Sequence, residues 1–174
     1  HGLSKAAVQA LTTEALAQAD LSGKRVLVII PDSTRTMPTA LFFQLFRELL
    51  GSEVAALDYM VALGTHQPMD DTALSALVGV PVQHGKAGAS HIFNHRWDQA
   101  ETFVTLGTLP AAEIEEISEG RLSLDVPIRL NRKILEYDQL LVCGPVFPHE
   151  VVGFSGGNKY FFPGIAAPEI INVT

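Results

Sequence analysis

Along much of this chain, short apolar runs of strand length alternate with longer stretches that have the spacing of amphipathic helices. The run at residues 25–30 (RVLVII) has the length and the β-branched side chains of a buried strand. In the stretch at 39–50 that follows, apolar residues recur with helical spacing, and Pro38 stands where a first helical turn accepts proline. The alternation predicts parallel strands, because parallel neighbours must be joined by a crossover, usually a helix.

The remaining elements continue this alternation. Helices are predicted at residues 3–19, 70–78 and 131–136, and strands at 53–63, 90–93, 102–106 and 139–142. Residues 121–130 are predicted to form a strand pair or ribbon, and Gly85 and Gly88 predict a loop ahead of the strand at 90–93. The fold class that we expect is α/β, with a mostly parallel, Rossmann-like sheet and helices on both of its faces.

The bulk composition favours a single packed domain over residues 1–174. Hydrophobic residues make up 47% of the chain and charged residues 18%, which is too apolar for a disordered chain and suits buried parallel strands. The net charge of −7 disfavours nucleic acid as a partner, because nucleic-acid binding needs a basic surface. An anionic guest would therefore have to be held by individually placed arginine and lysine side chains.

The cysteine content and the lengths of the apolar runs indicate the cellular compartment and whether the chain crosses a membrane. Cys143 has no second cysteine with which to form a disulfide or a cysteine-based zinc site, so we expect a reducing, cytoplasmic compartment. No apolar run reaches the ~18 residues of a membrane span, so we expect no membrane partner. The chain begins at His1 without a methionine, and residues 168–174 read as a helix that has just begun. We therefore expect a piece of a longer protein.

Three loops that carry reactive side chains each follow a predicted strand. They lie at residues 32–35, 64–66 and 149–159. Ligands of open parallel sheets bind beyond the carboxyl ends of the strands, and loops after neighbouring parallel strands meet at that edge. The sequence therefore predicts that the reactive side chains of the three loops surround one guest.

The first loop suits recognition of an anion. It consists of Asp32, Ser33, Thr34 and Arg35. The planar guanidinium fork of Arg35 matches a carboxylate or a phosphate, and the two hydroxyls add hydrogen-bond donors. A helix cap followed by a surface arginine is the structural alternative for the same residues.

The second and third loops each contain a histidine just past a predicted strand. His66 follows Gly64, and His149 follows Pro148. Imidazole exchanges protons near neutral pH, and two histidines on opposite sides of a substrate carbon can act as paired acid and base. A single loop histidine is more often structural, so this prediction depends on the two loops meeting.

The third loop also contains a glycine-rich segment that ends in Lys159. Glycine lets a backbone approach a ligand closely, and a lysine amine can serve as a nucleophile or a covalent anchor. A phosphate-binding P-loop is disfavoured, because Asn158 precedes Lys159 and Tyr160 replaces the hydroxyl that binds magnesium. A Rossmann glycine fingerprint is also absent from the sequence.

A histidine metal site is the other reading that the sequence invites. His84, His91 and His95 lie close together in the chain, and a helix would align the last two. Gly85 and Gly88 argue against a helix there, so we do not predict a metal site in this stretch.

Taken together and in order, the loop motifs resemble the nickel-pincer lactate racemase family. The motifs are Asp32-Ser33-Thr34-Arg35 followed by Pro38, then Gly64-Thr65-His66, then Pro148-His149-Glu150 leading to Ser155-Gly156-Gly157-x-Lys159 and Pro163-Gly164. Each motif is weak alone, and the resemblance covers the chain from about residue 25 to residue 174. It implies a two-domain enzyme, of which residues 1–174 are the N-terminal, cofactor-anchoring domain.

The resemblance also implies a cofactor and a reaction. The cofactor is a nickel pincer nucleotide, a pyridinium-3,5-bisthiocarboxylic acid mononucleotide that holds nickel, linked covalently through Lys159. His66 and His149 are implied as the catalytic acid and base in the racemisation or epimerisation of a 2-hydroxy acid by hydride transfer. The other implied cofactor-binding residues are Asp32, Ser33, Thr34, Arg35 and Pro163. The implied partners are a small 2-hydroxy acid and the proteins that make the cofactor.

Two departures from the family pattern limit what the resemblance implies. The family's histidine ligand to nickel would fall just after Thr174, so we expect no metal ligand within this chain and no activity of the chain alone. The aromatic run Tyr160-Phe161-Phe162 is bulkier than in the lactate enzyme, which leaves open which 2-hydroxy acid is used. The alternative function is a non-catalytic α/β module that binds a small anion or nucleotide.

Overall fold

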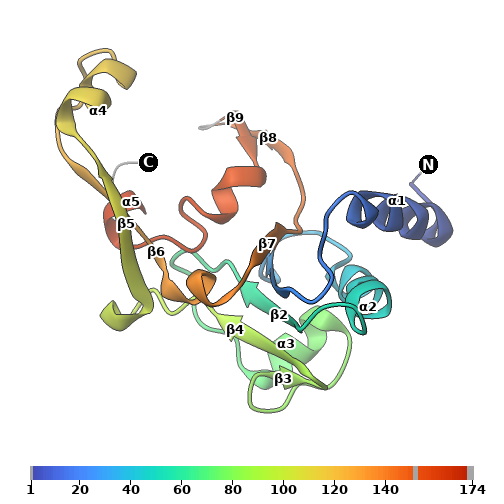
Figure 1. Cartoon of the computed structure of the whole chain (residues 1–174). Coiled ribbons are helices and arrows are strands. Elements are labelled where there is room, and N and C mark those ends of the chain that lie inside the picture. The colour runs from blue at the N-terminus through green and yellow to red at the C-terminus, as the bar shows by residue number, and fades with distance from the viewer. Residues whose placement is uncertain (1, 151–152, 172–174) are drawn as a thin grey trace.

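The computed structural model describes residues 2–150 and 153–171, and at its centre is a five-stranded sheet (Figure 1). The strand order is β3-β4-β2-β1-β7. Neighbours among β4, β2, β1 and β7 pair in parallel, and the short β3 runs antiparallel beside β4. The bounds are β1 Arg25–Ile30, β2 Ala56–Val61, β3 Lys86–Ala87, β4 Ser90–Asn94 and β7 Gln139–Val142. The mostly parallel sheet predicted from the sequence is confirmed.

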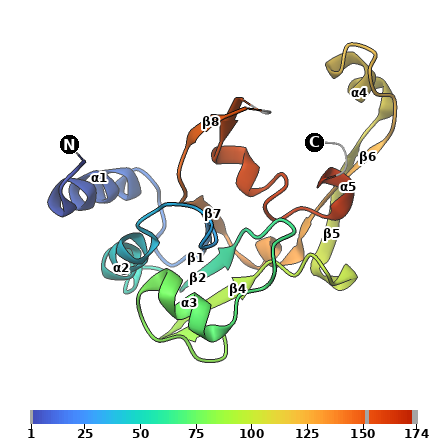
Figure 2. The same ribbon diagram turned by 180° about the vertical axis from the view of Figure 1, so that it is seen from behind.

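Three helices cover one face of the sheet, as two opposite views show (Figures 1 and 2). They are α1 (Lys5–Ala17), α2 (Thr39–Leu50) and α3 (Asp71–Val78). Successive side chains of a strand point to opposite faces, so Val26 and Val28 of β1 face these helices together with Phe43 of α2. The side chain of Asp70 accepts a hydrogen bond from the backbone N–H of Ala73 and begins α3, as a capping residue does.

The opposite face is covered by shorter elements. Leu27 and Ile29 of β1 point to this face and pack with Leu130 and Ile165. The covering elements are strand β6 (Val126–Asn131), the 3-10 helices η2 (Arg132–Glu136) and η3 (Gly157–Tyr160), and α5 (Pro168–Ile171). Helices therefore lie on both faces, as the sequence predicts, but on this face they are short turns that accompany a β-ribbon.

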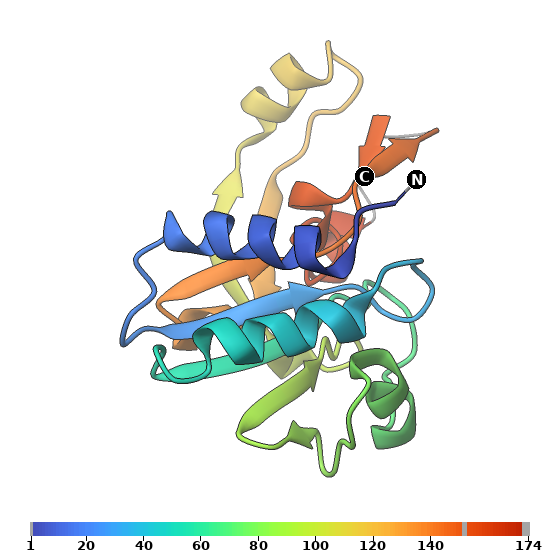
Figure 3. The ribbon, with the colours of Figure 1, turned by 90° about the vertical axis from the view of Figure 1, so that its right-hand side faces the viewer.

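The ribbon is formed by β5 and β6 and projects from the body of the molecule (Figure 3). Strand β5 (Phe103–Leu109) pairs antiparallel with β6, and α4 (Ala111–Ile117) lies at the far end between them. The prediction of a strand pair or ribbon within residues 121–130 is right only in part, because only residues 126–130 of this stretch are in a strand. Residues 121–125 form the return from α4, and the pairing partner of β6 comes from β5, about 20 residues earlier in the chain.

The loops that follow β2, β1 and β7 leave the sheet at one edge, because these three strands are parallel neighbours. After β7, the chain forms a hairpin of β8 (Phe147–His149) and β9 (Gly153–Ser155) before it enters η3. The 3-10 helix η1 (Ala100–Thr102) leads into β5. Among the described helices, none combines the length and apolar character that crossing a bilayer requires.

Candidate active site

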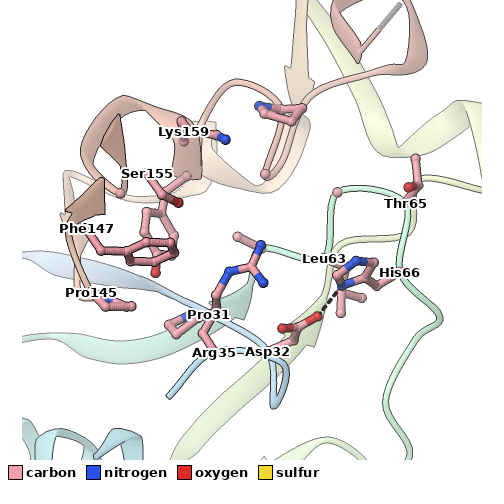
Figure 4. A pocket seen from close by; sticks show the side chains of 16 residues that line it. Pro31, Asp32, Arg35, Leu63, Thr65, His66, Pro145, Phe147, Ser155 and Lys159 are labelled. Carbon is pink, nitrogen blue, oxygen red and sulfur yellow. Dashed lines mark hydrogen bonds and ion pairs between the residues drawn. The ribbon is translucent and has the colours of Figure 1, made fainter. Parts of the chain in front are cut away.

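A cavity of about 210 Å³ lies at the carboxyl edge of the sheet, where the three loops meet (Figure 4). The predicted site residues that line it are Asp32, Arg35, His66, Lys159 and Pro163. They come from the loop after β1, the loop after β2 and the segment after β7. The convergence of these loops, which the strand order predicts, is therefore present in the structure.

Asp32 and His66 form a close pair at the base of the cavity. His66 Nδ1 lies 2.5 Å from Asp32 Oδ2, and the Asp32 side chain is only 8% exposed whereas that of His66 is 51% exposed. The other carboxylate oxygen, Oδ1, accepts hydrogen bonds from the backbone N–H of Thr34 at 3.0 Å and from the Thr34 hydroxyl at 2.5 Å. Asp32 thus uses both of its oxygens, one on its own loop and one on the imidazole.

These hydrogen bonds decide the charge of Asp32. Burial alone would raise the pKa of the Asp32 carboxyl, but hydrogen bonds from Thr34 and His66 outweigh burial and hold the pKa below its usual value. The carboxylate is therefore ionised at neutral pH and can only accept, so His66 Nδ1 carries the proton of this pair. The second ring nitrogen of His66, Nε2, remains for proton exchange with a guest.

The loop that carries His66 is fixed from several sides. The indole Nε1–H of Trp97 donates to the backbone oxygen of His66 at 2.9 Å. The Asn94 side chain accepts from the backbone N–H of Met69 and donates to its carbonyl oxygen, both at 2.9 Å. The backbone N–H of Gly64 donates to Gly164 O at 2.9 Å, which ties this loop to the segment that follows Lys159. His66 is therefore presented by a well-supported turn.

Arg35 and Lys159 bring two positive charges to the cavity. Both side chains extend into the same space above the Asp32–His66 pair (Figure 4). Arg35 Nη1 donates to the Thr34 hydroxyl at 3.3 Å. Within residues 2–150 and 153–171 neither Arg35 nor Lys159 forms an ion pair with a carboxylate, although Arg96, Arg129 and Lys133 do. The two cations are left to attract an anionic guest.

Glycine positions Lys159 by allowing close backbone packing. Gly156 has φ +97°, and a Cβ atom there would lie 2.6 Å from Pro145 O. The carbonyl oxygen of Gly156 accepts from the backbone N–H of Lys159 at 3.1 Å, which opens η3. A larger residue at position 156 would push apart the two strands of the chain that flank the cavity.

The other predicted site residues lie outside the cavity wall. Ser33 lines a neighbouring groove between α2 and α3, and Thr34 is turned back onto Asp32. His149 is the last residue of β8, where it pairs with Gly153 across the hairpin. The structure therefore brings together His66, Lys159, Arg35 and Asp32 around the cavity, whereas His149 is not among the residues that line it.

Three residues that line the cavity were not predicted as site residues, although Ser155 stands in the glycine-lysine motif and Tyr160 in the aromatic run. Ser155, Phe147 and Tyr160 line the cavity, and the ring of Tyr160 fills the space next to Gly144. Tyr160 belongs to the bulky aromatic run that leaves the 2-hydroxy acid open in the sequence analysis, and the structure shows its side chain buried at the cavity wall. Its position directly after Lys159 is the signal that could have identified it.

No group of three or more His, Cys, Asp or Glu side chains among the described residues could hold a metal ion. His95, which the sequence placed near a possible metal site, is fully buried instead. Asn131 Nδ2 donates to His95 Nδ1 at 3.1 Å, so Nε2–H donates to Ala166 O at 3.2 Å. Burial lowers the pKa of His95 to about 4, so the ring is neutral and structural.

The cavity thus combines an oriented imidazole with the guanidinium of Arg35 and the amine of Lys159. An imidazole whose Nδ1–H is held by a carboxylate can take or give a proton at Nε2. A guanidinium can bind a carboxylate through two parallel hydrogen bonds. Such a set suits proton transfer on a small anionic guest.

Comparison with known proteins places the chain in a family. Residues 3–174 match the family model described as the lactate racemase N-terminal domain. The chain is 27% identical over 150 residues to a lactate racemase of Thermoanaerobacterium thermosaccharolyticum, which covers 85% of this chain and 31% of that protein.

Two solved structures show the same fold over most of the chain. A crystal structure of a Thermotoga maritima protein superposes with a TM-score of 0.80 at 32% identity, covering 95% of this chain and 39% of the other. The lactate racemase apoprotein of T. thermosaccharolyticum superposes with a TM-score of 0.63 at 26% identity, covering 89% of this chain and 33% of the other. The chain spans about a third of the length of these relatives. It belongs to the lactate racemase N-terminal domain family.

Proposed function

We propose that the full-length protein racemises or epimerises a 2-hydroxy acid, and that this chain is the N-terminal domain that anchors its cofactor. The observation that carries the proposal is the cavity that the Asp32–His66 pair shares with Arg35 and Lys159. The family match and the lactate racemase relative support the reaction class. The remainder of the enzyme, in this proposal, is a second domain.

His66 is the proposed acid/base residue on one face of the substrate carbon. The Asp32 carboxylate holds Nδ1–H, so Nε2 takes the hydroxyl proton of the substrate, and the carboxylate stabilises the imidazolium that forms. When the hydroxyl is restored with the opposite configuration, an acid/base group on the other face of the carbon returns a proton. A reaction that reverses one stereocentre without net change needs a second such group on the other face, and His149 is the proposed one.

Arg35 is the proposed carboxylate-binding residue. Its guanidinium lines the cavity and is free of ion pairs with the described residues, so its fork is open to a carboxylate. A substrate held in this way presents its hydroxyl-bearing carbon next to the carboxylate, within the space that His66 lines. Arg35 therefore orients the substrate and His66 moves its proton.

The cavity is suited to a nickel pincer nucleotide. The unpaired Arg35 guanidinium matches the negative charge of a mononucleotide, and the half-buried Lys159 offers an amine at the cavity wall for a covalent link. Ser33, Thr34 and Pro163 are further proposed contacts, and no nickel ligand is assigned to the described residues. When bound, the group supplies an acceptor for the substrate hydride, which side chains do not.

Intact-protein mass spectrometry tests the anchoring role of Lys159. The full-length protein made together with the cofactor-producing enzymes should carry added mass, and Lys159→Ala should lose it. Lys86→Ala, which removes an exposed lysine of β3 away from the cavity, should keep it. An unmodified mass in cofactor-replete cells would contradict the covalent anchor.

A binding module for small anions is the second candidate function. The unpaired charges of Arg35 and Lys159 favour it, because anion capture needs nothing more. The two candidates differ in His66, which a binding module does not need. Interconversion of D- and L-lactate, followed by chiral chromatography, separates them.

A further inference from the structure

Tyr160 faces the cavity from within the core of the protein. Its side chain packs with Ile29 and Ile165 on the second face of the sheet, and it is only 8% exposed. It nevertheless lines the cavity together with Asp32 and Arg35. A buried ring in this position has one polar atom, its hydroxyl oxygen, to offer to a guest.

Gly144 fixes where the Tyr160 ring lies. A Cβ atom at residue 144 would sit 1.7 Å from the Tyr160 hydroxyl oxygen and 2.1 Å from Cζ, so the phenol occupies the space that a side chain would need. The preceding residue, Cys143, donates its backbone N–H to Ile29 O at 2.9 Å. The hydroxyl is therefore held at the carboxyl ends of β7 and β1, where the loop of Arg35 begins.

The Tyr160 hydroxyl makes no hydrogen bond within residues 2–150 and 153–171. By comparison, the hydroxyl of Tyr137 donates to Asp58 Oδ2 at 2.8 Å. Tyr59 also lacks a partner, but its oxygen is sealed inside the core, whereas Tyr160 stands at a cavity wall. Burial, with a smaller effect of Cys143, raises the pKa of Tyr160 to about 12, against a lowering effect of Arg35. The phenol is therefore protonated at neutral pH and has a proton to donate.

We propose that the Tyr160 hydroxyl donates a hydrogen bond to the substrate carboxylate that Arg35 binds, which makes Tyr160 a substrate-contacting residue. This inference rests on the proposed function. A carboxylate offers about four lone-pair sites, and a bidentate guanidinium fills two of them. Asp32 cannot donate to the remaining lone-pair sites because an ionised carboxylate only accepts hydrogen bonds. A neutral donor beside Arg35 would therefore complete the hydrogen bonds to the substrate carboxylate.

The substrate class follows from this arrangement. Arg35 and Tyr160 both line the cavity and both carry hydrogen-bond donors, and the Tyr160 ring fills the space next to Gly144. The guest is a small carboxylate whose charged end is held between Arg35 and Tyr160. Tyr160 therefore contributes to binding rather than to proton transfer.

The experiment compares Tyr160→Phe with Tyr59→Phe in the full-length protein. Both changes delete one unpartnered hydroxyl and keep the ring, but only Tyr160 lines the cavity. Calorimetric titration of the cofactor-free protein with lactate gives a dissociation constant. Turnover of the cofactor-loaded protein gives KM and kcat. We expect Tyr160→Phe to raise the dissociation constant and KM about tenfold with kcat little changed, and Tyr59→Phe to leave both constants unchanged.

Each outcome decides the inference. Equal lactate affinity and KM for Tyr160→Phe and the wild type would overturn it, even where the wild type racemises lactate. Failure of the wild type to bind lactate would overturn it as well. A protein that binds lactate through Tyr160 but does not racemise it would support the contact and contradict the proposed reaction.

Discussion

The two sides of the cavity are held in place in different ways. On the polar wall, formed by Asp32, Arg35 and residues 62–66, the Asp32 and His66 side chains bond to each other. On the glycine wall, formed by residues 144–147 and 155–164, three glycines let neighbouring parts of the chain pack in the space that their side chains would need. Cβ atoms at Gly144, Gly156 and Gly164 would meet other atoms at 1.7, 2.6 and 2.4 Å. In the proposed function, the polar wall supplies the proton-transfer group, and the glycine wall supplies the shape of the cavity.

Of the variants considered, Asp32→Asn should have the largest effect on activity, because it disrupts the Asp32–His66 pair of the polar wall. The amide removes the charge that orients His66 and stabilises its protonated form, so kcat should fall about 10²-fold or more. Asp58→Asn is the matched control, because Asp58 is a buried carboxylate that bonds Tyr137 and His91 outside the cavity. Steady-state kinetics of the two variants makes the comparison, and an equal loss of kcat in both would contradict the role of Asp32.

As the pH falls, the contribution of His95 to stability should be lost before that of Asp32. His95 bonds to the backbone oxygen of Ala166, just past the glycine wall. Burial lowers the pKa of His95 to about 4 from the usual ~6.5. The unfolded chain binds the proton first, so the contribution of His95 to stability is complete above about pH 6.5 and lost as pH falls to about 4. The difference between the folded and unfolded pKa of His95 corresponds to a loss of about 3 kcal/mol in the free energy of unfolding.

Asp32 acts in a lower pH window. Burial opposes its charge but is outweighed by its hydrogen bonds, so its pKa lies below the usual ~3.8 and its contribution is present above that pH and lost below it. Urea unfolding of the wild type and of His95→Gln between pH 7.5 and 4 separates the two. The wild type should lose stability and the variant should lose little, and parallel curves would contradict the assignment to His95.

Gly144→Ala should disturb the glycine wall most among its glycines. The new methyl group cannot coexist with the Tyr160 ring, so the free energy of unfolding should fall by about 1–3 kcal/mol. Gly107→Ala in β5 meets no atom within 4 Å and should change it by less than about 0.5 kcal/mol. Combining Gly144→Ala with Tyr160→Leu should recover part of the loss in urea unfolding. Strictly additive effects would show that the two positions are not in contact.

Trp97→Phe should have the smallest effect of these variants, and it tests whether the polar wall depends on the bond from Trp97 to the His66 backbone. It removes one hydrogen bond to the backbone oxygen of His66 and keeps an aromatic ring, so the free energy of unfolding should fall by about 1 kcal/mol. Thermal unfolding measures this change. A kcat that falls several-fold at unchanged KM would show that the bond also positions His66. Unchanged stability and unchanged kcat would contradict any role of the Trp97 bond in supporting His66.

The sequence predicted the sheet and the meeting of its loops because apolar periodicity and parallel topology are local and general rules. The partner of β6 was not predictable from residues 121–130, because antiparallel pairing with β5 is set by tertiary contacts. Asp32 and His66 were predicted to meet, but not to bond, since loop sequence does not give side-chain direction. Tyr160 was noted for its bulk but was not predicted as a site residue, because nothing in a single sequence separates a buried ring from a cavity wall.

Racemisation of lactate by His66→Ala in the full-length, cofactor-loaded protein tests the central claim most directly. Chiral chromatography follows the rate, calorimetry follows lactate binding, and His91→Gln serves as the control histidine, on β4 and away from the cavity. The account predicts that His66→Ala loses at least about 10²-fold in rate while still binding lactate, and that His91→Gln matches the wild type. Full racemase activity of His66→Ala would contradict it.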